Sequence, residues 1–179
     1  MADASDVAEL RERIERALPG TLVPTPSRAN TQAVPVKKGE QVAPNFLATD
    51  DPVITADQLP NVAGYLRDTL GYELLTNITA TDYLADGIIE MVYHFVRLNG
   101  GAPIAIKVRT SREQPEVPSL TAEWPGADFQ EREAFDLFGV VFRGHANLRR
   151  IYMWDEFEGF PMRKDFPKQG DKYFEDTEE

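Results

Sequence analysis

Apolar residues recur every three or four positions at the beginning of the chain, as they do on one face of a helix. The residues that follow this spacing are Val7, Leu10, Ile14 and Leu18. Ser5 or Asp6 can cap such a helix, because their side chains accept hydrogen bonds from its first free backbone N–H groups. The pattern predicts an N-terminal helix over residues 1–18, which Pro19 and Gly20 end.

Two further segments have helical patterns, at residues 55–70 and 128–138. The apolar face of the first is formed by Leu59, Val62, Ala63, Leu66 and Leu70. Thr55 can cap this helix, but a start at Pro60 is the alternative, because proline is tolerated in a first turn. Gly71 is suited to the left-handed conformation that commonly ends a helix.

Strand-forming residues gather between these helices. The predicted strands cover residues 53–54, 72–81, 88–98 and 103–109. In the last of them Ile104, Ile106 and Val108 alternate with more polar or smaller residues, which indicates one buried face. Asn99-Gly100-Gly101 is a hairpin signal. Strands that follow one another, rather than alternating with helices, predict a small α+β domain of two layers over residues 52–139.

Two regions have no regular pattern. Residues 19–51 contain five prolines, Pro19 at the end of the helix and Pro24, Pro26, Pro35 and Pro44 beyond it. Proline removes a backbone donor and restricts the residue before it, so this region is predicted to be a linker or an extended segment lying on the domain. Residues 140–179 are predicted to be an extended C-terminal arm. It ends in nine residues with five acids and one Lys, which we expect to be solvated and mobile.

The amino-acid composition excludes several classes of functional site. The chain has 179 residues, no Cys, two His and a formal net charge of −11. The lack of Cys excludes a disulfide framework, a cysteine nucleophile, thiolate-held zinc and a Cys-ligated iron–sulfur cluster. The acidic balance argues against a nucleic-acid partner, since phosphate contacts need Lys and Arg.

No apolar run approaches the roughly 20 residues of a membrane span, and the N-terminus lacks a secretory signal. We expect a cytoplasmic, prokaryotic protein, and a processed organellar protein is the alternative.

The C-terminal arm has a different character from the rest of the chain. From Arg143 to Lys168 it carries six cationic and four acidic side chains, a net charge of +2. The aromatic residues from Arg143 to Lys168 are Tyr152, Trp154, Phe157, Phe160 and Phe166. Aromatic residues and Arg are enriched in the cores of protein interfaces. The arm is therefore predicted to lie in a groove of a partner protein, and a solvated charged loop is the alternative.

The densest charge cluster, at residues 131–136, allows a catalytic hypothesis. Glu131 and Glu133 could act as general acid and base with His145, as in an autonomous hydrolase. No Ser, Cys or second His lies nearby in sequence to complete a nucleophile–base set. Arg132 and Asp136 are four positions apart and could instead form a helical side-chain pair. The chain also lacks a glycine-rich phosphate-binding fingerprint, so we expect no dinucleotide site.

Four blocks in fixed order carry a family resemblance. They are Glu131-Arg132-Glu133-Ala134-Phe135-Asp136-Leu137-Phe138-Gly139-Val140, Phe142-Arg143-Gly144-His145, Leu148-Arg149-Arg150-Ile151 and Pro161-Met162-Arg163-Lys164-Asp165-Phe166-Pro167. Over residues 53–167 the chain resembles the 30-kDa subunit of respiratory complex I, the proton-pumping NADH:quinone oxidoreductase. Two positions depart from the family pattern. Ala146 replaces a proline, and Phe160 replaces a histidine, so no proton transfer is expected at that position.

The resemblance implies an α+β domain with a mixed sheet and a C-terminal arm that wraps around the large quinone-site subunit. It implies no cofactor in this chain, with FMN and iron–sulfur clusters held by partner subunits of the peripheral arm. It places the complex at the cytoplasmic face of the plasma membrane, with this chain bound to the membrane only through the complex. The predicted partner interface comprises Glu131, Arg132, Glu133, Asp136, Arg143, His145, Leu148, Arg149, Arg150, Trp154, Arg163, Lys164 and Asp165.

An equivalent subunit of a related complex is the nearest alternative. A membrane-bound hydrogenase or a ferredoxin-driven oxidoreductase could contain such a chain, and the sequence does not separate them. An autonomous hydrolase is the more distant alternative.

Overall fold

The computed structural model describes residues 4–27 and 47–167. Its main sheet has the strand order β1-β4-β3-β2, with β1 parallel to β4 and the other neighbours antiparallel. The strands are β1 (Val53–Ile54), β2 (Leu74–Tyr83), β3 (Ile88–Val96) and β4 (Ile104–Ser111). The α-helices of the described ranges are α1 (Ala4–Ala17), α2 (Leu59–Asp68) and α3 (Ala127–Phe138). This arrangement confirms the predicted α+β class with a mixed sheet.

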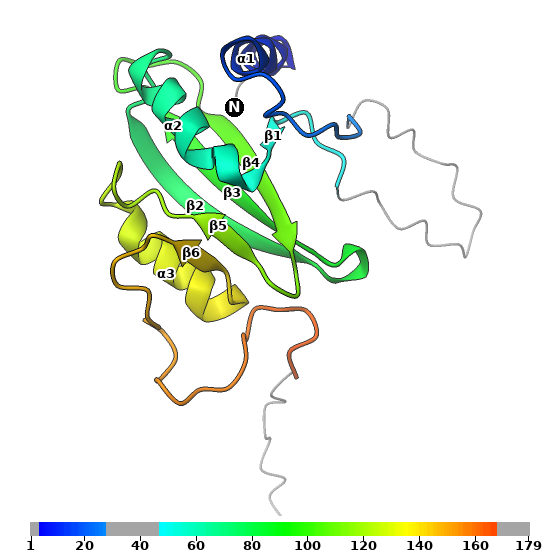
Figure 1. The fold of residues 1–179 in the computed structure, drawn as a ribbon, viewed down its shortest axis with the longest axis vertical. Helices are drawn as coiled ribbons and strands as arrows, with labels where there is room; N and C mark the ends of the chain where they lie inside the picture. The colour runs from blue at the N-terminus through cyan, green and yellow to red at the C-terminus, as the bar shows by residue number, and fades with distance from the viewer. Residues whose placement is uncertain (1–3, 28–46, 168–179) are drawn as a thin grey trace, which may run out of the picture.

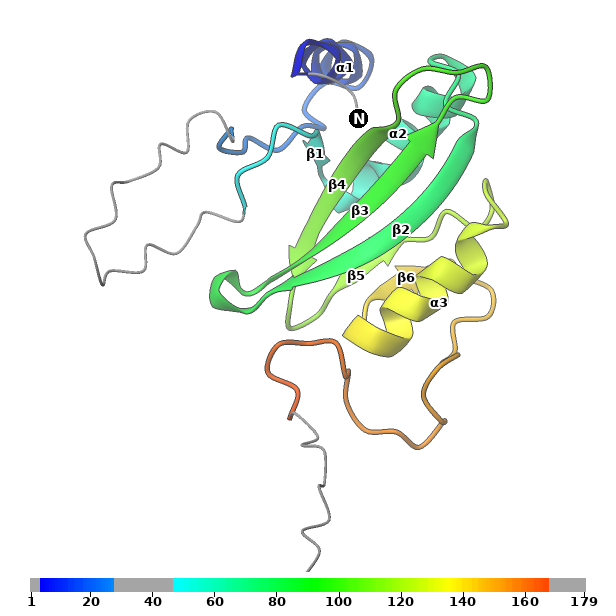
Figure 2. The same cartoon turned by 180° about the vertical axis from the view of Figure 1, so that it is seen from behind.

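The core lies on the face of the sheet that α2 crosses, while α3 lies alongside β2 (Figure 1). On this face β3 contributes Ile89, Met91, Tyr93 and Phe95, all fully buried. The period of two that the sequence shows in β4 continues the same face. Burying each such side chain contributes about 1.5–3 kcal/mol. The opposite face, which α2 does not cross, faces the viewer in Figure 2 and is called the open face below.

The start of α2 follows the second of the two predicted possibilities. A 3-10 turn, η2 (Ala56–Gln58), precedes the helix, and Pro60 lies in its first turn. Thr55 makes no side-chain capping bond. A second 3-10 turn, η3 (Leu84–Asp86), connects β2 to β3. Among the described helices, none combines the length and the apolar character that a membrane crossing requires.

A small parallel sheet is present that the sequence patterns do not predict. β5 (Glu116–Pro118) pairs with β6 (Val141–Arg143). Strands of three residues are too short to show a period of two, so only the tertiary pairing reveals them. Val140 and Phe142 are buried in the core. The folded part of the chain therefore continues past residue 139, the end of the domain that the sequence predicts.

The described ends of the Pro-rich region lie beside β1. Leu22 forms a bridge with Ile54, and the Val23 N–H donates to Val53 O at 2.8 Å. The Thr49 N–H donates to Pro26 O at 2.9 Å, which brings the two ends together. Residues 28–46, in the middle of the predicted linker, lie outside the described residues. The predicted acidic tail lies outside them as well.

Candidate functional site

Asp136 organises the beginning of the C-terminal arm. Its carboxylate is fully buried and accepts hydrogen bonds from Arg150 Nη1 at 2.7 Å and from the backbone N–H of Ile151, Tyr152 and Met153 at 2.7–3.0 Å. Burial alone would raise the pKa of Asp136, but these hydrogen bonds outweigh it and lower the pKa below its ordinary value. One carboxylate of α3 thus holds four consecutive residues of the arm.

Asp82, at the end of β2, holds the arm at a second point. Arg112 donates to it from Nε at 2.7 Å and from Nη2 at 3.1 Å. The backbone N–H of Lys164 donates to it at 2.8 Å. Arg112 also pairs with Asp165 of the arm. Burial opposes ionisation of Asp82, yet these donors lower its pKa below the ordinary value.

The arm also covers the C-terminal end of α3. Met162 N–H donates to Leu137 O at 3.1 Å, and Arg163 Nε donates to Phe138 O at 2.7 Å. These donors satisfy carbonyl groups that a helix end leaves free. Gly139 ends the helix with φ +77°, and a Cβ there would lie 2.5 Å from the ring of Phe160. Glycine is therefore required by both the backbone conformation and the aromatic contact.

Glu131 forms its hydrogen bonds inside the folded domain. It is fully buried and accepts hydrogen bonds from Ser119 Oγ at 2.6 Å and from the Leu120 N–H at 2.7 Å. Burial raises the pKa of Glu131, and these two hydrogen bonds oppose the rise. Glu133, two positions along, is exposed. The two carboxylates therefore do not face a common cleft, and the arrangement does not support the acid–base pair of the hydrolase hypothesis.

His145 lies against the beginning of α3. Its Nε2 lies 3.4 Å from both the carboxylate and the backbone oxygen of Asp128, and its Nδ1 accepts from the Asn147 N–H at 3.0 Å. The side chain is 1% exposed. Within residues 4–27 and 47–167, no group of three His, Asp or Glu side chains could hold a metal ion.

One predicted pairing is wrong. Arg132 does not pair with Asp136, but contacts Asp128 at 3.5 Å and donates to Arg149 O at 3.2 Å. Asp136 pairs instead with Arg150. Residues 149–153 turn back over α3, which brings donors to Asp136 that no local spacing predicts.

The other predicted interface residues are distributed as follows. Arg143 forms ion pairs with Asp57 and Glu116, so it too is engaged within the chain. Leu148 is half-buried and packs against the core. Besides Arg143, the exposed members of the set are Glu133, Arg149, Trp154, Lys164 and Asp165. Arg163 is half-buried. Their contact with a partner stays a prediction.

An apolar hollow on the arm, called the aromatic basin below, has a volume of about 770 Å³. Its lining consists of Met153, Trp154, Phe157, Pro161, Arg163, Lys164, Phe166 and Pro167. Trp154 contacts Phe157 edge-on at 4.8 Å between ring centroids, and Phe157 stacks on Phe166 at 5.8 Å. Three parts of the arm form the basin, residues 153–157, 161–164 and 166–167. The sequence alone does not show that they lie together.

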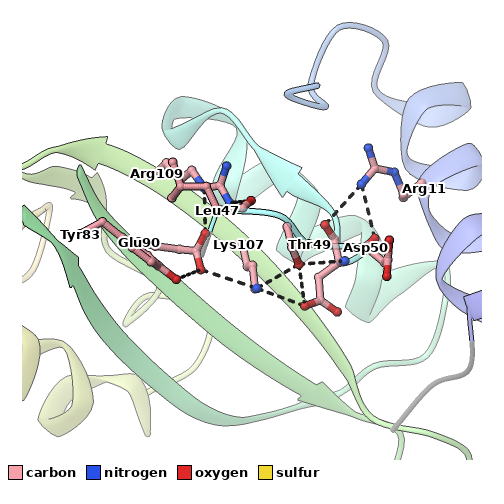
Figure 3. A network of polar contacts seen from close by, with 9 residues as sticks. Arg11, Leu47, Thr49, Asp50, Tyr83, Glu90, Lys107 and Arg109 are labelled. Carbon is pink, nitrogen blue, oxygen red and sulfur yellow. Dashed lines mark hydrogen bonds and ion pairs between the residues drawn. The ribbon is translucent and has the colours of Figure 1, made fainter. Parts of the chain in front are cut away.

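The open face carries a polar network that the sequence patterns do not single out (Figure 3). Buried Glu90 accepts from Arg109 Nε at 2.7 Å and lies 3.6 Å from Lys107 Nζ. Lys107 donates to Thr49 Oγ1 at 3.0 Å and pairs with Asp51 at 3.2 Å. The network fastens the returning end of the Pro-rich region to the sheet. In the sequence, the sign of this network was one charged residue, Glu90, within the largely apolar run that forms β3.

Nearby, α1 is tied to the same segment. Arg11 Nη1 donates to the backbone oxygens of Asp50 and Asp51 at 3.4 and 3.3 Å. Arg109 Nη2 donates to Leu47 O at 2.6 Å. These contacts join the N-terminal helix, the segment 47–51 and the open face in one network.

The structure thus defines a class of protein: an α+β domain whose buried carboxylates hold a structured, aromatic C-terminal arm. The chain matches the family described as "Respiratory-chain NADH dehydrogenase, 30 Kd subunit" over residues 52–172. It belongs to this family, which confirms the resemblance that the sequence blocks carry.

Relatives support the assignment. An NADH-quinone oxidoreductase subunit of Moorella thermoacetica is 52% identical over 117 residues, which cover 65% of this chain and 79% of that protein. The corresponding protein of a Roseiflexus species is 42% identical over 117 residues, covering 64% and 67%. A chain of the membrane-bound sulfane sulfur reductase, an archaeal respiratory membrane complex, superposes with a TM-score of 0.65 at 23% identity, covering 90% of this chain and 86% of that chain. This last likeness concerns the fold alone.

Proposed function

We propose that this chain is a non-catalytic structural subunit of the peripheral arm of a proton-translocating NADH:quinone oxidoreductase. Its C-terminal arm docks on the large quinone-site subunit and stabilises it. Other subunits carry FMN and the iron–sulfur clusters and pass the electrons to quinone. The complex lies at the cytoplasmic face of the plasma membrane, and this chain reaches the membrane only through it.

The observation that carries the proposal is the exposed aromatic surface on an anchored arm. Trp154 is 63% exposed, Tyr152 59% and Met162 56%. Their neighbours in the chain are fixed by Asp136, Asp82 and the end of α3. Large exposed apolar patches on ordered structure mark protein interaction sites. A fixed surface also loses little conformational freedom on binding, which favours stable docking.

The test separates docking from catalysis. The complex is purified through a tag on this chain, and both the recovery of the quinone-site subunit and NADH:quinone reductase activity are measured. Deletion of residues 144–179 is expected to abolish recovery of the quinone-site subunit. His145→Ala and Glu133→Gln are expected to leave activity per assembled complex unchanged. Turnover by the isolated chain, or lost activity in a fully assembled Glu133→Gln complex, contradicts the proposal.

A subunit of a related membrane complex is the second candidate. The fold likeness to a chain of an archaeal sulfane sulfur reductase complex means that the fold by itself does not select the electron donor. Hydrogen or ferredoxin could replace NADH in such a complex. The purified assembly is therefore assayed with NADH, hydrogen and reduced ferredoxin in turn. Oxidation of NADH is the expected result, and oxidation only of another donor favours the second candidate.

A further inference from the structure

The aromatic basin is held in shape before any partner arrives. Met153, on one wall, is fixed by the hydrogen bond from its N–H to Asp136. Arg163, on the other wall, is fixed by its hydrogen bond to Phe138 O. Both anchors belong to α3, a regular helix of the folded domain. The rings of Phe157 and Phe166 stack between the walls. A preformed hollow of this kind costs little ordering entropy when it is filled.

The rim of the basin carries positive charge without a direct counter-ion. Among the described residues, no carboxylate lies within ion-pair distance of Arg163 or Lys164. The residues that line the basin include no acid. Burial and the charge of Arg112 lower the pKa of Arg163, and the carboxylates of Asp82 and Asp165 offset this only in part. A carboxylate from a partner protein, placed beside Arg163, would offset the free-energy cost of keeping this cation half-buried.

We infer that the aromatic basin binds a segment of the partner subunit in which an apolar anchor residue stands beside Asp or Glu. This inference rests on the proposed docking function and specifies its chemistry. The anchor packs against the lining residues Trp154 and Phe166, and the carboxylate pairs with Arg163 or Lys164. The volume of about 770 Å³ exceeds what one side chain fills, so several residues of the segment enter the hollow.

The occupant is identified by photo-crosslinking in the assembled complex. Benzoylphenylalanine replaces Trp154 in the full chain, and Leu98, 72% exposed in the β3–β4 turn, serves as the control position. After irradiation of cells, the cross-linked peptides are identified by mass spectrometry. The expected adduct at position 154 is a peptide of another chain with an apolar residue within about four positions of Asp or Glu, the reach of one helical turn. The Leu98 position is expected not to yield this peptide.

Three adducts at position 154 would overturn the inference. The first is a peptide from residues 168–179 of this same chain, which would make the basin an internal contact. The second is a partner peptide without acidic residues. The third is an adduct of a lipid or another small molecule. Failure to form any adduct in a complex that has assembled also counts against the inference.

Substitutions then measure the contribution of each part. Trp154→Ala and Lys164→Glu are expected to lower retention of the partner subunit at least tenfold, while Leu98→Ala leaves it unchanged. The effect of Lys164→Glu is expected to shrink at high salt, because ion pairs are screened. Thermal unfolding of each variant establishes that the chain is folded. Unchanged retention in both variants refutes the basin while the docking function stands, whereas absence of the wild-type chain from any complex refutes both.

Discussion

Asp136 and Glu90 are both buried carboxylates that hold an irregular segment on the domain, but they do so with different donors. Asp136 accepts three backbone N–H groups and one Arg. Glu90 is surrounded by the charged side chains of Arg109 and Lys107. Backbone donors fix the path of the chain itself. Side-chain donors fix only their own ends, so the segment they hold can shift while the ion pairs persist.

The difference distinguishes the two irregular segments, the arm and residues 47–51, by how firmly each is held. Residues 144–167 of the arm keep a defined course without a helix or strand, because their N–H groups bind Asp136, Asp82 and the end of α3. The segment 47–51 is fastened by Lys107 and Arg109 through long side chains. We expect substitutions of the groups that hold the arm to destabilise the protein more than substitutions of those that hold residues 47–51.

The largest expected effect is that of Asp136→Ala. It leaves Arg150 and three N–H groups without their acceptor, and breaking a buried ion pair costs about 3–5 kcal/mol. Urea unfolding is expected to show this loss, together with faster proteolysis after Arg149 and Lys164. The control is Glu133→Ala, an exposed carboxylate on the same helix, which should unfold as the wild type does. An Asp136→Ala protein with wild-type stability would disprove the anchoring role.

The next effect in size is that of Gly139→Ala. The left-handed backbone costs about 1–2 kcal/mol for a residue with a Cβ, and the clash with Phe160 adds about 1–3 kcal/mol. The double variant Gly139→Ala with Phe160→Ala is expected to recover the second part and not the first. Urea unfolding of both single variants and the double variant gives the coupling energy. Strict additivity would show that the ring contact contributes nothing.

Glu90→Gln tests the carboxylate that is held by side-chain donors. It removes the charge that Arg109 and Lys107 share, and unmet buried donors cost about 1–3 kcal/mol. The loss is expected to be smaller than that of Asp136→Ala, because Lys107 keeps Asp51 and Thr49 as partners. Proteolysis is expected to increase near residues 47–51 and to stay unchanged in the arm. Equal or greater destabilisation than Asp136→Ala would reverse the comparison.

The smallest effect concerns pH. The folded-state pKa values of Asp82 and Asp136 lie below their ordinary value of 3.8. Each carboxylate therefore contributes stability that is present above its unfolded pKa and is lost as pH falls through its folded pKa. Glu131, whose pKa is raised, has the opposite sign and stabilises relatively more at low pH. The urea midpoint is expected to fall as the pH is lowered from about 6 to about 3, across the ordinary Asp pKa, and to fall less in Asp82→Asn. An identical pH dependence in both proteins would refute the contribution of Asp82.

Much of the domain could be predicted from local patterns. The spacing of Leu59, Val62 and Leu66 predicted α2, and the alternation of Ile104, Ile106 and Val108 predicted the buried face of β4. Both were confirmed because a helix or strand shows its own period within a few turns. The four blocks of residues 131–167 also sufficed to identify the family.

The candidate site could be predicted only in part. The sequence pointed to the aromatic arm, and Trp154, Arg163 and Lys164 are on the basin. It also placed Glu131, Arg132 and Asp136 at a partner interface, although all three are buried in this chain. An Asp in an amphipathic helix has the same local pattern whether its carboxylate faces solvent or the returning chain. Burial of a polar group is decided by what covers it, and that lies elsewhere in the sequence.

The sequence by itself determined the helices, the main strands, the absence of Cys chemistry and the family. The tertiary structure alone decided which carboxylates hold the chain together. Asp136 meets donors 14–17 positions further on, and Arg109 reaches Leu47 across 62 positions. Periodicity reports on neighbours one or two turns away, whereas these contacts depend on the path of the whole chain. The arm, whose composition predicts burial by a partner, is anchored by its own domain through residue 167, and its aromatic basin lies open on its surface.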